Sequence, residues 1–214
     1  MAKRECIRVC TVVANDDAAS APIDAIEKRR GVAGEIVMWK VAGARAAQGA
    51  SLDEVIEDAR HAVDETRSIG VGLSASTIPA VGKSNFTIRN GEMEVGIGQH
   101  GEPGILNQAT LPARDVSKLM FDKLATDLPF TRGDKISLLL SGLGPMPLME
   151  QYILYAEIAV CANRALRVFM RGQYLHVAGN DGRERDADQT RCRPRCMPRL
   201  FLCQSIGITL GDAA

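Results

Sequence analysis

The chain has 214 residues, of which 46% are hydrophobic and 20 are glycine, so it is long enough for one large α/β domain with a buried core. Lysine plus arginine and aspartate plus glutamate both number 26, a balance that favours neither nucleic acid nor an anionic membrane as a partner. No segment approaches the ~20 apolar residues of a membrane span and the N-terminus lacks an apolar signal core, so we expect a cytoplasmic protein.

Residues 5–13 have the composition of a β-strand, here one that lacks the start of its own domain, and residues 15–17 predict a turn. Cys6 and Cys10 lie in this strand. Four residues apart on a helix they would share a face suited to zinc, but in a strand they only point to the same side, so we expect no metal site. The remaining cysteines are too unevenly spaced for a disulfide framework: Cys161, Cys192, Cys196 and Cys203.

Arg29 and Arg30 stand beside glycines in the segment Arg-Arg-Gly-Val-Ala-Gly, residues 29–34. Two arginines in this setting could bind phosphate, or the segment could form a structural turn into the helix expected at 36–48. Ser51 and Glu54 then have the spacing of a capping box. The helix that they open has one apolar face, made by Leu52, Val55, Ile56, Ala59 and Val63, and leaves His61 on the surface.

Residues 66–79 predict a strand followed by a loop that carries the hydroxyls of Ser74, Ser76 and Thr77. Lys83 follows in a Gly-Lys-Ser fragment of a phosphate-binding loop, but Thr77 stands where the upstream glycine of that motif belongs. We therefore interpret Lys83 as structural or peripheral, with ligand contact as the alternative.

Residues 92–104 predict a strand that breaks into a loop with four glycines and a proline, and His100 lies in this loop. Glycine backbone can approach a ligand closely, and imidazole can act as a general base, a metal ligand or a nucleophile near neutral pH. The alternative is a turn histidine whose nitrogens satisfy nearby backbone groups.

The periodicity of residues 113–128 predicts an amphipathic helix, and the apolar run 135–141 predicts a central strand. A loop rich in glycine and proline, 142–147, then opens a helix at 148–162. This loop could cradle an anion at the helix N-terminus, but we favour an ordinary connection at the carboxyl edge of the sheet.

Three blocks of this sequence resemble the substrate-binding K subunit or domain of the dihydroxyacetone (glycerone) kinase family. Residues 96–104, Gly-Ile-Gly-Gln-His-Gly-Glu-Pro-Gly, are similar to the family's GxGxHGEPG segment; residues 71–86 and 133–153 resemble two further family blocks. The family also carries RRGxAG before a helix, which favours the structural turn for residues 29–34. Gln99 replaces an apolar family residue, Ser141 replaces an asparagine, and residues 145–147 are unusually rich in proline.

The resemblance implies an α/β fold with a mixed sheet flanked by helices, like the second domain of the K subunit. It also implies that a ring nitrogen of His100 bonds covalently to the substrate carbonyl carbon and forms a hemiaminal. The substrate would be dihydroxyacetone or a related ketotriose or ketotetrose. The family's catalytic aspartate lies in a first domain that we expect to be missing here, so no catalytic residue, cofactor site or metal site is assigned to this chain.

The resemblance further implies a separate L subunit or domain that carries Mg-ATP or ADP, and a homodimer. We expect the chain by itself to be an incomplete, inactive kinase component. The alternatives are a non-catalytic ketone-binding or regulatory module and a metal- or RNA-binding protein built on the C-terminal tail.

The resemblance extends over residues 5–170, which we assign to a partial K domain. Residues 171–214 are rich in arginine and cysteine. A metal- or RNA-binding tail would have this composition, but Cys192 and Cys196 form a CxxxC without a second ligand pair. A reading frame shifted by one nucleotide from residue 172 permits a sequence similar to the family's closing segment. We therefore expect an irregular, off-frame tail.

Overall fold

The computed structural model describes residues 2–75, 84, 86–129, 135–143, 146–165, 167–176 and 199–206. Three loop residues singled out in the sequence, Ser76, Thr77 and Lys83, lie outside these ranges. The expectations for their side chains therefore stay predictions.

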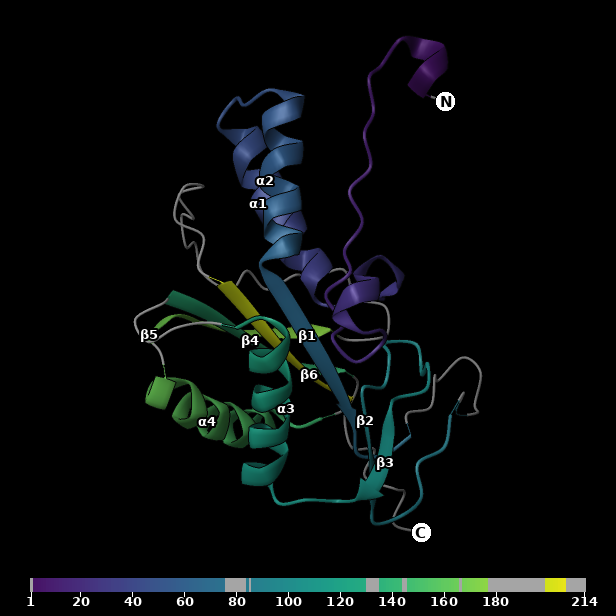
Figure 1. The fold of residues 1–214 in the computed structure, drawn as a ribbon, viewed down its shortest axis with the longest axis vertical. Coiled ribbons are helices and arrows are strands. Elements are labelled where there is room, and N and C mark those ends of the chain that lie inside the picture. The colour runs from purple at the N-terminus through teal and green to yellow at the C-terminus, as the bar shows by residue number, and fades with distance from the viewer. Residues whose placement is uncertain are drawn as a thin grey trace.

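The strands of the described chain form one six-stranded sheet in the order β3-β2-β1-β6-β4-β5 (Figure 1). The four strands β1, β6, β4 and β5 run parallel to one another. Beyond β1, β2 pairs antiparallel with β1, and the edge strand β3 pairs antiparallel with β2. The bounds are Thr66–Gly72 for β1, Glu92–Val95 for β2, Leu106–Ala109 for β3, Lys135–Leu143 for β4, Arg167–His176 for β5 and Arg199–Ile206 for β6. This mixed sheet with helices confirms the predicted fold class, and β4 is an interior strand, as predicted.

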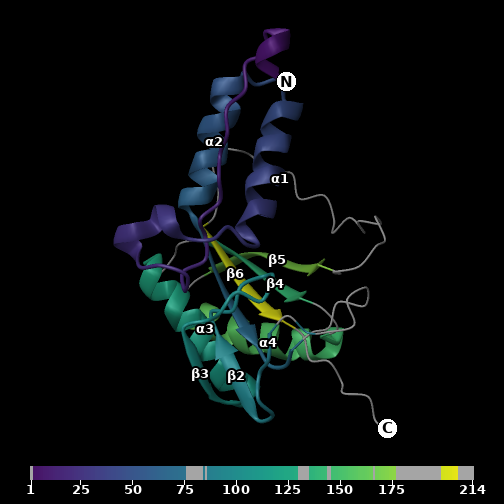
Figure 2. The same cartoon turned by 90° about the vertical axis from the view of Figure 1, so that its right-hand side faces the viewer.

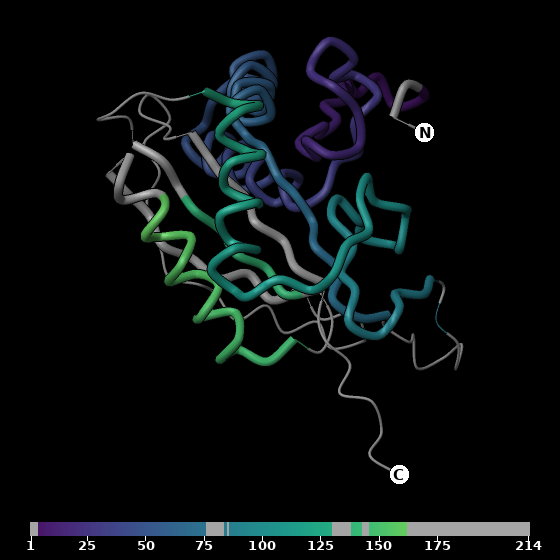
Figure 3. Tube along the Cα trace, turned by 60° about the horizontal axis from the view of Figure 1, so that its bottom comes forward, coloured from purple at the N-terminus to yellow at the C-terminus, as the bar shows by residue number. Residues whose placement is uncertain are grey.

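Two helices, α3 (Ala113–Asp127) and α4 (Leu148–Ala165), pack against each other and on one face of the sheet (Figures 1 and 3). Their inward side chains and those of β1, β2 and β4 form the main core. The fully buried members of this core include Ile69, Val71, Met93, Met120, Leu124, Leu138, Leu140 and Ile158. Both helices begin where the apolar periodicity predicted.

The other two helices, α1 (Gly34–Ala47) and α2 (Leu52–Asp64), pair with each other and project beyond one end of the sheet (Figures 1 and 2). The capping box at the start of α2 is confirmed: the Glu54 N–H donates to the Ser51 hydroxyl, and the Ser51 N–H donates to the Glu54 carboxylate. The apolar face is buried at its centre, and His61 is exposed, as predicted.

The predicted strand at residues 5–13 is wrong. The chain forms a 3-10 turn at Ala2–Glu5 and then runs without regular structure beside α1 and α2, with Ile7, Val9 and Val13 more than half exposed. Both sides of β1 are occupied, because β1 pairs with β2 and β6, and Asp17, which follows this segment, forms a bridge with Ser68 of β1. The segment therefore has no free side of β1 along which to form a ladder.

The expectation of an irregular tail does not hold for residues 171–176 and 199–206. The first range completes β5, and the second forms β6, which pairs in parallel with both β1 and β4. Residues 177–198 and 207–214 lie outside the described chain. The domain division at residue 170 and the shifted reading frame stay predictions.

Candidate functional site

The loop that connects β2 to β3, residues 96–104, carries His100 and is called the His100 loop. Gly96 and Gly101 have φ angles of +82° and +86°, which favour glycine over residues with a side chain. The Gly96 N–H donates to the Gly70 carbonyl of β1 at 2.7 Å, and the Gly98 N–H donates to the Glu102 carbonyl at 2.9 Å. The loop is therefore attached to the sheet at its start and closed on itself around His100.

Glu102 holds His100 at two points. One carboxylate oxygen accepts the His100 backbone N–H at 2.9 Å, and the other lies 3.2 Å from the ring Nδ1. Burial acts to raise the pKa of Glu102, but the backbone N–H groups of Glu102 and His100 and the His100 ring hold this pKa below its ordinary value. When Nδ1–H donates to this carboxylate, the lone pair of the imidazole is on Nε2.

The His100 side chain is 83% exposed. Among the groups that the structure describes, it is thus presented at the surface and not enclosed by a pocket. The arrangement suits a nucleophile or base that meets a ligand from outside the loop. In the same part of the chain no cluster of three or more histidine, cysteine, aspartate or glutamate side chains is placed to hold a metal ion, and Cys6 and Cys10 are exposed.

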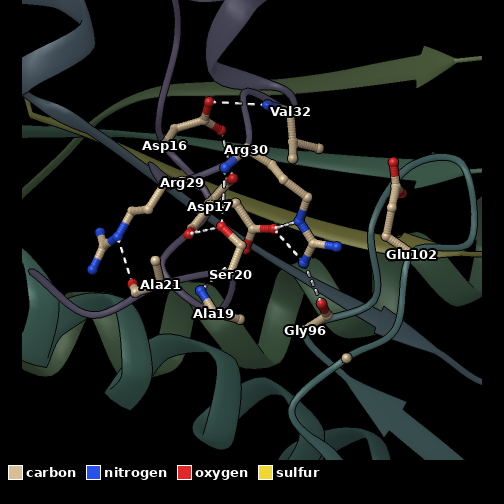
Figure 4. Close-up of polar contacts among 12 residues, drawn as sticks. Asp16, Asp17, Ala19, Ser20, Ala21, Arg29, Arg30, Val32, Gly96 and Glu102 are labelled. Atoms are coloured by element: carbon tan, nitrogen blue, oxygen red, sulfur yellow. Dashed lines mark hydrogen bonds and ion pairs between the residues drawn. The ribbon is translucent and has the colours of Figure 1, made fainter. Parts of the chain in front are cut away.

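Arg30 joins the base of the His100 loop to the segment before α1 (Figure 4). Its Nη2 donates to the Gly96 carbonyl at 2.8 Å, and its Nε donates to the Asp17 carboxylate at 2.9 Å. Asp17 also accepts the Ala19 N–H at 3.1 Å, and its side chain is only 2% exposed. Burial raises the pKa of Asp17, and the charge of Arg30 offsets only part of this effect.

The neighbouring Asp16 fixes the turn into α1. Its carboxylate accepts the Val32 N–H at 3.0 Å, the Gly34 N–H at 2.9 Å and the Ser68 hydroxyl. A β-carbon at Gly34 would lie 2.4 Å from the Asp16 carboxyl carbon, so only glycine fits there. The prediction of a structural turn at residues 29–34 is confirmed.

Arg29 and Arg30, although adjacent, bind different carboxylates. Arg29 donates two hydrogen bonds to Asp127 at the end of α3, at 2.7 and 2.6 Å, and Arg67 of β1 donates a third at 2.7 Å. Burial acts to raise the pKa of Asp127, but the two guanidinium groups hold it below its ordinary value. Because both arginines of the 29–34 segment are bound by carboxylates, the structure does not support the phosphate alternative.

The connection between β4 and α4 has the features of an ordinary loop, as far as the structure describes it. The Gln151 side chain donates to the Met146 carbonyl at 3.0 Å and fills the space above Gly142, where a β-carbon would lie 2.2 Å from its nitrogen. Ser141 is buried, and its hydroxyl has no hydrogen-bond partner among the described residues. Residues 144 and 145 lie outside them.

Sequence reasoning singled out His100 and Arg30 separately, and the structure brings their segments together. It missed the roles of Asp16, Asp17 and Glu102. Two adjacent aspartates before the small residues 18–21 could have indicated a buried polar turn, because buried carboxylates require nearby hydrogen-bond donors. The loop that carries Glu102 was identified, but the contact with the ring was not.

The Dak1 domain family matches residues 1–175 of the chain. The dihydroxyacetone-binding subunit DhaK of PTS-dependent dihydroxyacetone kinase 2 from Listeria innocua is 44% identical over 74% of this chain and 47% of its own length. L-erythrulose kinase from Pectobacterium atrosepticum is 37% identical over 70% of this chain and 26% of its own length. The chain thus spans about half the length of the DhaK subunit that it matches.

Two solved structures are similar to the fold. The dihydroxyacetone kinase from C. freundii in complex with AMP-PNP and Mg²⁺ has a TM-score of 0.62 and 32% identity, over 74% of this chain and 28% of that one. The dihydroxyacetone kinase operon co-activator Dha-DhaQ has a TM-score of 0.68 and 27% identity, over 79% of this chain and 53% of that one. None of the described helices has the length and apolar character needed to cross a membrane.

Proposed function

The chain belongs to the Dak1 domain family of dihydroxyacetone kinases, and we propose that it carries the ketone-binding half of a K subunit, with His100 as the residue that captures the substrate carbonyl. The observation that carries this proposal is the contact between His100 Nδ1 and Glu102, 3.2 Å apart in a loop with the family's glycine pattern. When Nδ1–H donates in this contact, the imidazole lone pair is on Nε2, and the 83% exposure of the side chain supports its approach by a ligand.

The capture step balances as an addition. The Nε2 lone pair forms a bond to the carbonyl carbon, the C=O π bond breaks, and its electron pair moves to the carbonyl oxygen. That oxygen takes a proton from solvent, while the imidazole releases its Nδ1 proton through the Glu102 carboxylate. Glu102 therefore stabilises the positive charge that develops on the ring during the attack, and the product is a neutral hemiaminal.

The bond selects a ketone and rejects glycerol, which has no carbonyl carbon to attack. Two chain lengths fit this chemistry: a ketotriose such as dihydroxyacetone, and a ketotetrose of the kind named in the L-erythrulose kinase relative. The covalent step is the same for both, so it does not by itself choose between them.

Phosphoryl transfer in this proposal requires a nucleotide-bearing partner. We assign no acid/base residue for phosphoryl transfer and no nucleotide site to the described residues, and a dihydroxyacetone kinase structure is known in complex with AMP-PNP and Mg²⁺. A separate L subunit or domain would supply the phosphoryl group from Mg-ATP, or from a bound ADP that a phosphotransfer system first phosphorylates, and its metal would neutralise the charge of that group. We expect the chain alone to bind the ketone without phosphorylating it.

A second candidate is a regulatory module that binds a ketone without turnover. The observation that favours it is the likeness to the operon co-activator Dha-DhaQ, at a TM-score of 0.68. In that case the His100 adduct would act as a sensor of the ketone, and addition of an L subunit and nucleotide would give no phosphorylated product.

The test is adduct formation with dihydroxyacetone labelled with ¹³C at its carbonyl carbon, followed by ¹³C NMR and by native mass spectrometry. We expect the carbonyl resonance to move to the range of a tetrahedral carbon and the protein mass to rise by one dihydroxyacetone. His100→Ala should abolish both changes, and His61→Ala, an exposed histidine on α2, should not. An adduct that persists in His100→Ala, or none in the unmodified chain, would contradict the proposal.

A further inference from the structure

We propose that Arg30, held by Asp17, is a positioning residue that fixes the His100 loop in the geometry that the ketone adduct requires. The inference rests on the proposed function of His100 and adds two residues from a segment about 70 positions earlier in the chain. Arg30 acts through the loop backbone and makes no contact with substrate in this proposal.

Arg30 is itself held by Asp17 and Ser20 in the segment before α1. Its guanidinium contacts one Asp17 oxygen through Nε at 2.9 Å and through Nη2 at 2.8 Å. Its backbone N–H donates to the Ser20 hydroxyl at 3.0 Å, and its carbonyl accepts the Asp17 N–H at 3.1 Å. The guanidinium therefore has a defined position before it meets the His100 loop.

The contact with the loop is made where the backbone changes direction. Arg30 Nη2 donates to the carbonyl of Gly96, the first residue of the loop and one with a left-handed φ of +82°. A donor at this carbonyl selects one orientation of the peptide unit that leads to Gly98 and His100. Without it, a flexible glycine backbone has several orientations of similar energy.

The same guanidinium also lies beside the group that holds His100. A β-carbon built at Gly98 would fall 2.6 Å from Arg30 Nη1 and 2.2 Å from the nearer Glu102 carboxylate oxygen. Arg30 and Glu102 therefore both lie close to Gly98. A shift of the Arg30 guanidinium would change the surroundings of the Glu102 carboxylate, which contacts the His100 ring.

Arg29 offers a matched control because it is adjacent to Arg30 but points away from the loop (Figure 4). Its guanidinium is fully buried and bonded to Asp127, so its loss removes an ion pair at least as buried as that of Arg30. Arg29→Gln therefore reports the general cost of removing a buried charge in this segment. Arg30→Gln reports that cost together with any loss of loop geometry.

The experiment measures the affinity of the ketone adduct by ¹³C NMR in the full chain carrying Arg30→Gln, Arg30→Lys or Arg29→Gln, with urea unfolding of each. A displaced nucleophile costs about 10- to 100-fold in adduct formation, which we expect for Arg30→Gln. Arg30→Lys keeps the charge and one donor and should recover part of the loss. Arg29→Gln should be less stable than Arg30→Gln. It should nevertheless keep the adduct affinity within about twofold, because mutations at separate sites act independently. Equal losses in Arg29→Gln and Arg30→Gln, or none in either, would overturn the proposal.

A second readout does not depend on ketone binding. The backbone N–H groups of Gly98 and His100 donate to Glu102, so their hydrogen exchange measures the closure of the loop. We expect faster exchange in Arg30→Gln and unchanged exchange in Arg29→Gln under conditions where both are folded. If the unmodified chain forms no adduct, the proposed function fails, and this exchange measurement still decides whether Arg30 positions the loop.

Discussion

Replacement of Asp127 by asparagine tests how much of the stability of this fold depends on the charges buried at the end of α3. The Asp127 side chain is 11% exposed and accepts three hydrogen bonds from Arg29 and Arg67, whose own side chains are 0% and 6% exposed. Asparagine keeps the shape and one acceptor oxygen but removes the negative charge. Two buried guanidinium groups then remain without a counter-charge.

The loss of one partner from a buried ion pair typically costs 3–5 kcal/mol, and we expect about 3 kcal/mol here because Asp127 retains some contact with water. With a urea m-value of about 2 kcal/mol per molar, this cost lowers the unfolding midpoint by about 1.5 M. The appropriate control is Asp122→Asn on the same helix. Asp122 pairs with Lys118 four residues earlier, both side chains are more than half exposed, and the expected cost is below about 0.5 kcal/mol.

The effect should also depend on pH with a defined sign. The pKa of Asp127 is lower in the folded chain than its ordinary value, so its contribution is complete above about pH 4 and is lost as the pH falls through the folded pKa. The difference in unfolding free energy between the unmodified chain and Asp127→Asn should therefore shrink on acidification. Taking this difference removes the opposite trend of Asp17, whose pKa is raised by burial. A cost at pH 7 no larger than that of Asp122→Asn, or one that stays constant into acid, would refute the reasoning.

Three further predictions address the helix cap, the His100 loop and the tail. Ser51→Ala removes the hydroxyl that accepts the Glu54 N–H and should lower the unfolding free energy by about 1 kcal/mol in urea titrations. Gly98→Ala places a methyl group against the ends of the Arg30 and Glu102 side chains, so ketone titrations should show weakened adduct formation. Its urea unfolding midpoint should fall by less than that of Asp127→Asn. Truncation after His176 removes β6 from between β1 and β4, so circular dichroism should show loss of cooperative unfolding; unchanged stability would instead support an off-frame tail.

The sequence predicted those elements whose cause is local. The Ser51–Glu54 spacing located the start of α2, and the apolar run at 135–141 located an interior strand. Strand partners are not local, and this explains both errors. Residues 5–13 have a strand-like pattern but no available edge beside β1, whereas residues 199–206 occupy a central position despite the arginine-rich composition around them.

The candidate site was likewise predictable only where its features are local in the sequence. The glycine pattern around His100 identified the loop, because glycine backbone can approach a ligand closely and imidazole can act as a base, a metal ligand or a nucleophile. The contact between Arg30 and Gly96 joins residues 66 positions apart, and the side-chain pair of Arg30 and Asp17 joins residues 13 apart. Neither spacing has a helical or strand period, so only the fold reveals that the two arginines at 29 and 30 serve different parts of the molecule.

The exposure of His100 separates two tasks that a ketone-binding site must perform. Covalent capture needs only an oriented imidazole, and in our proposal Glu102 and Arg30 supply that orientation within the loop and at its base. Discrimination between sugars of different length needs residues that enclose the ligand, since ligand sites typically bury most of a small molecule. His100 is 83% exposed among the described residues, so in the proposed function these residues would supply the chemistry of capture and not the enclosure. In the proposed K subunit, the choice between ketone and alcohol would therefore depend on the His100 loop, and the choice among ketones on enclosing residues other than those described beside it.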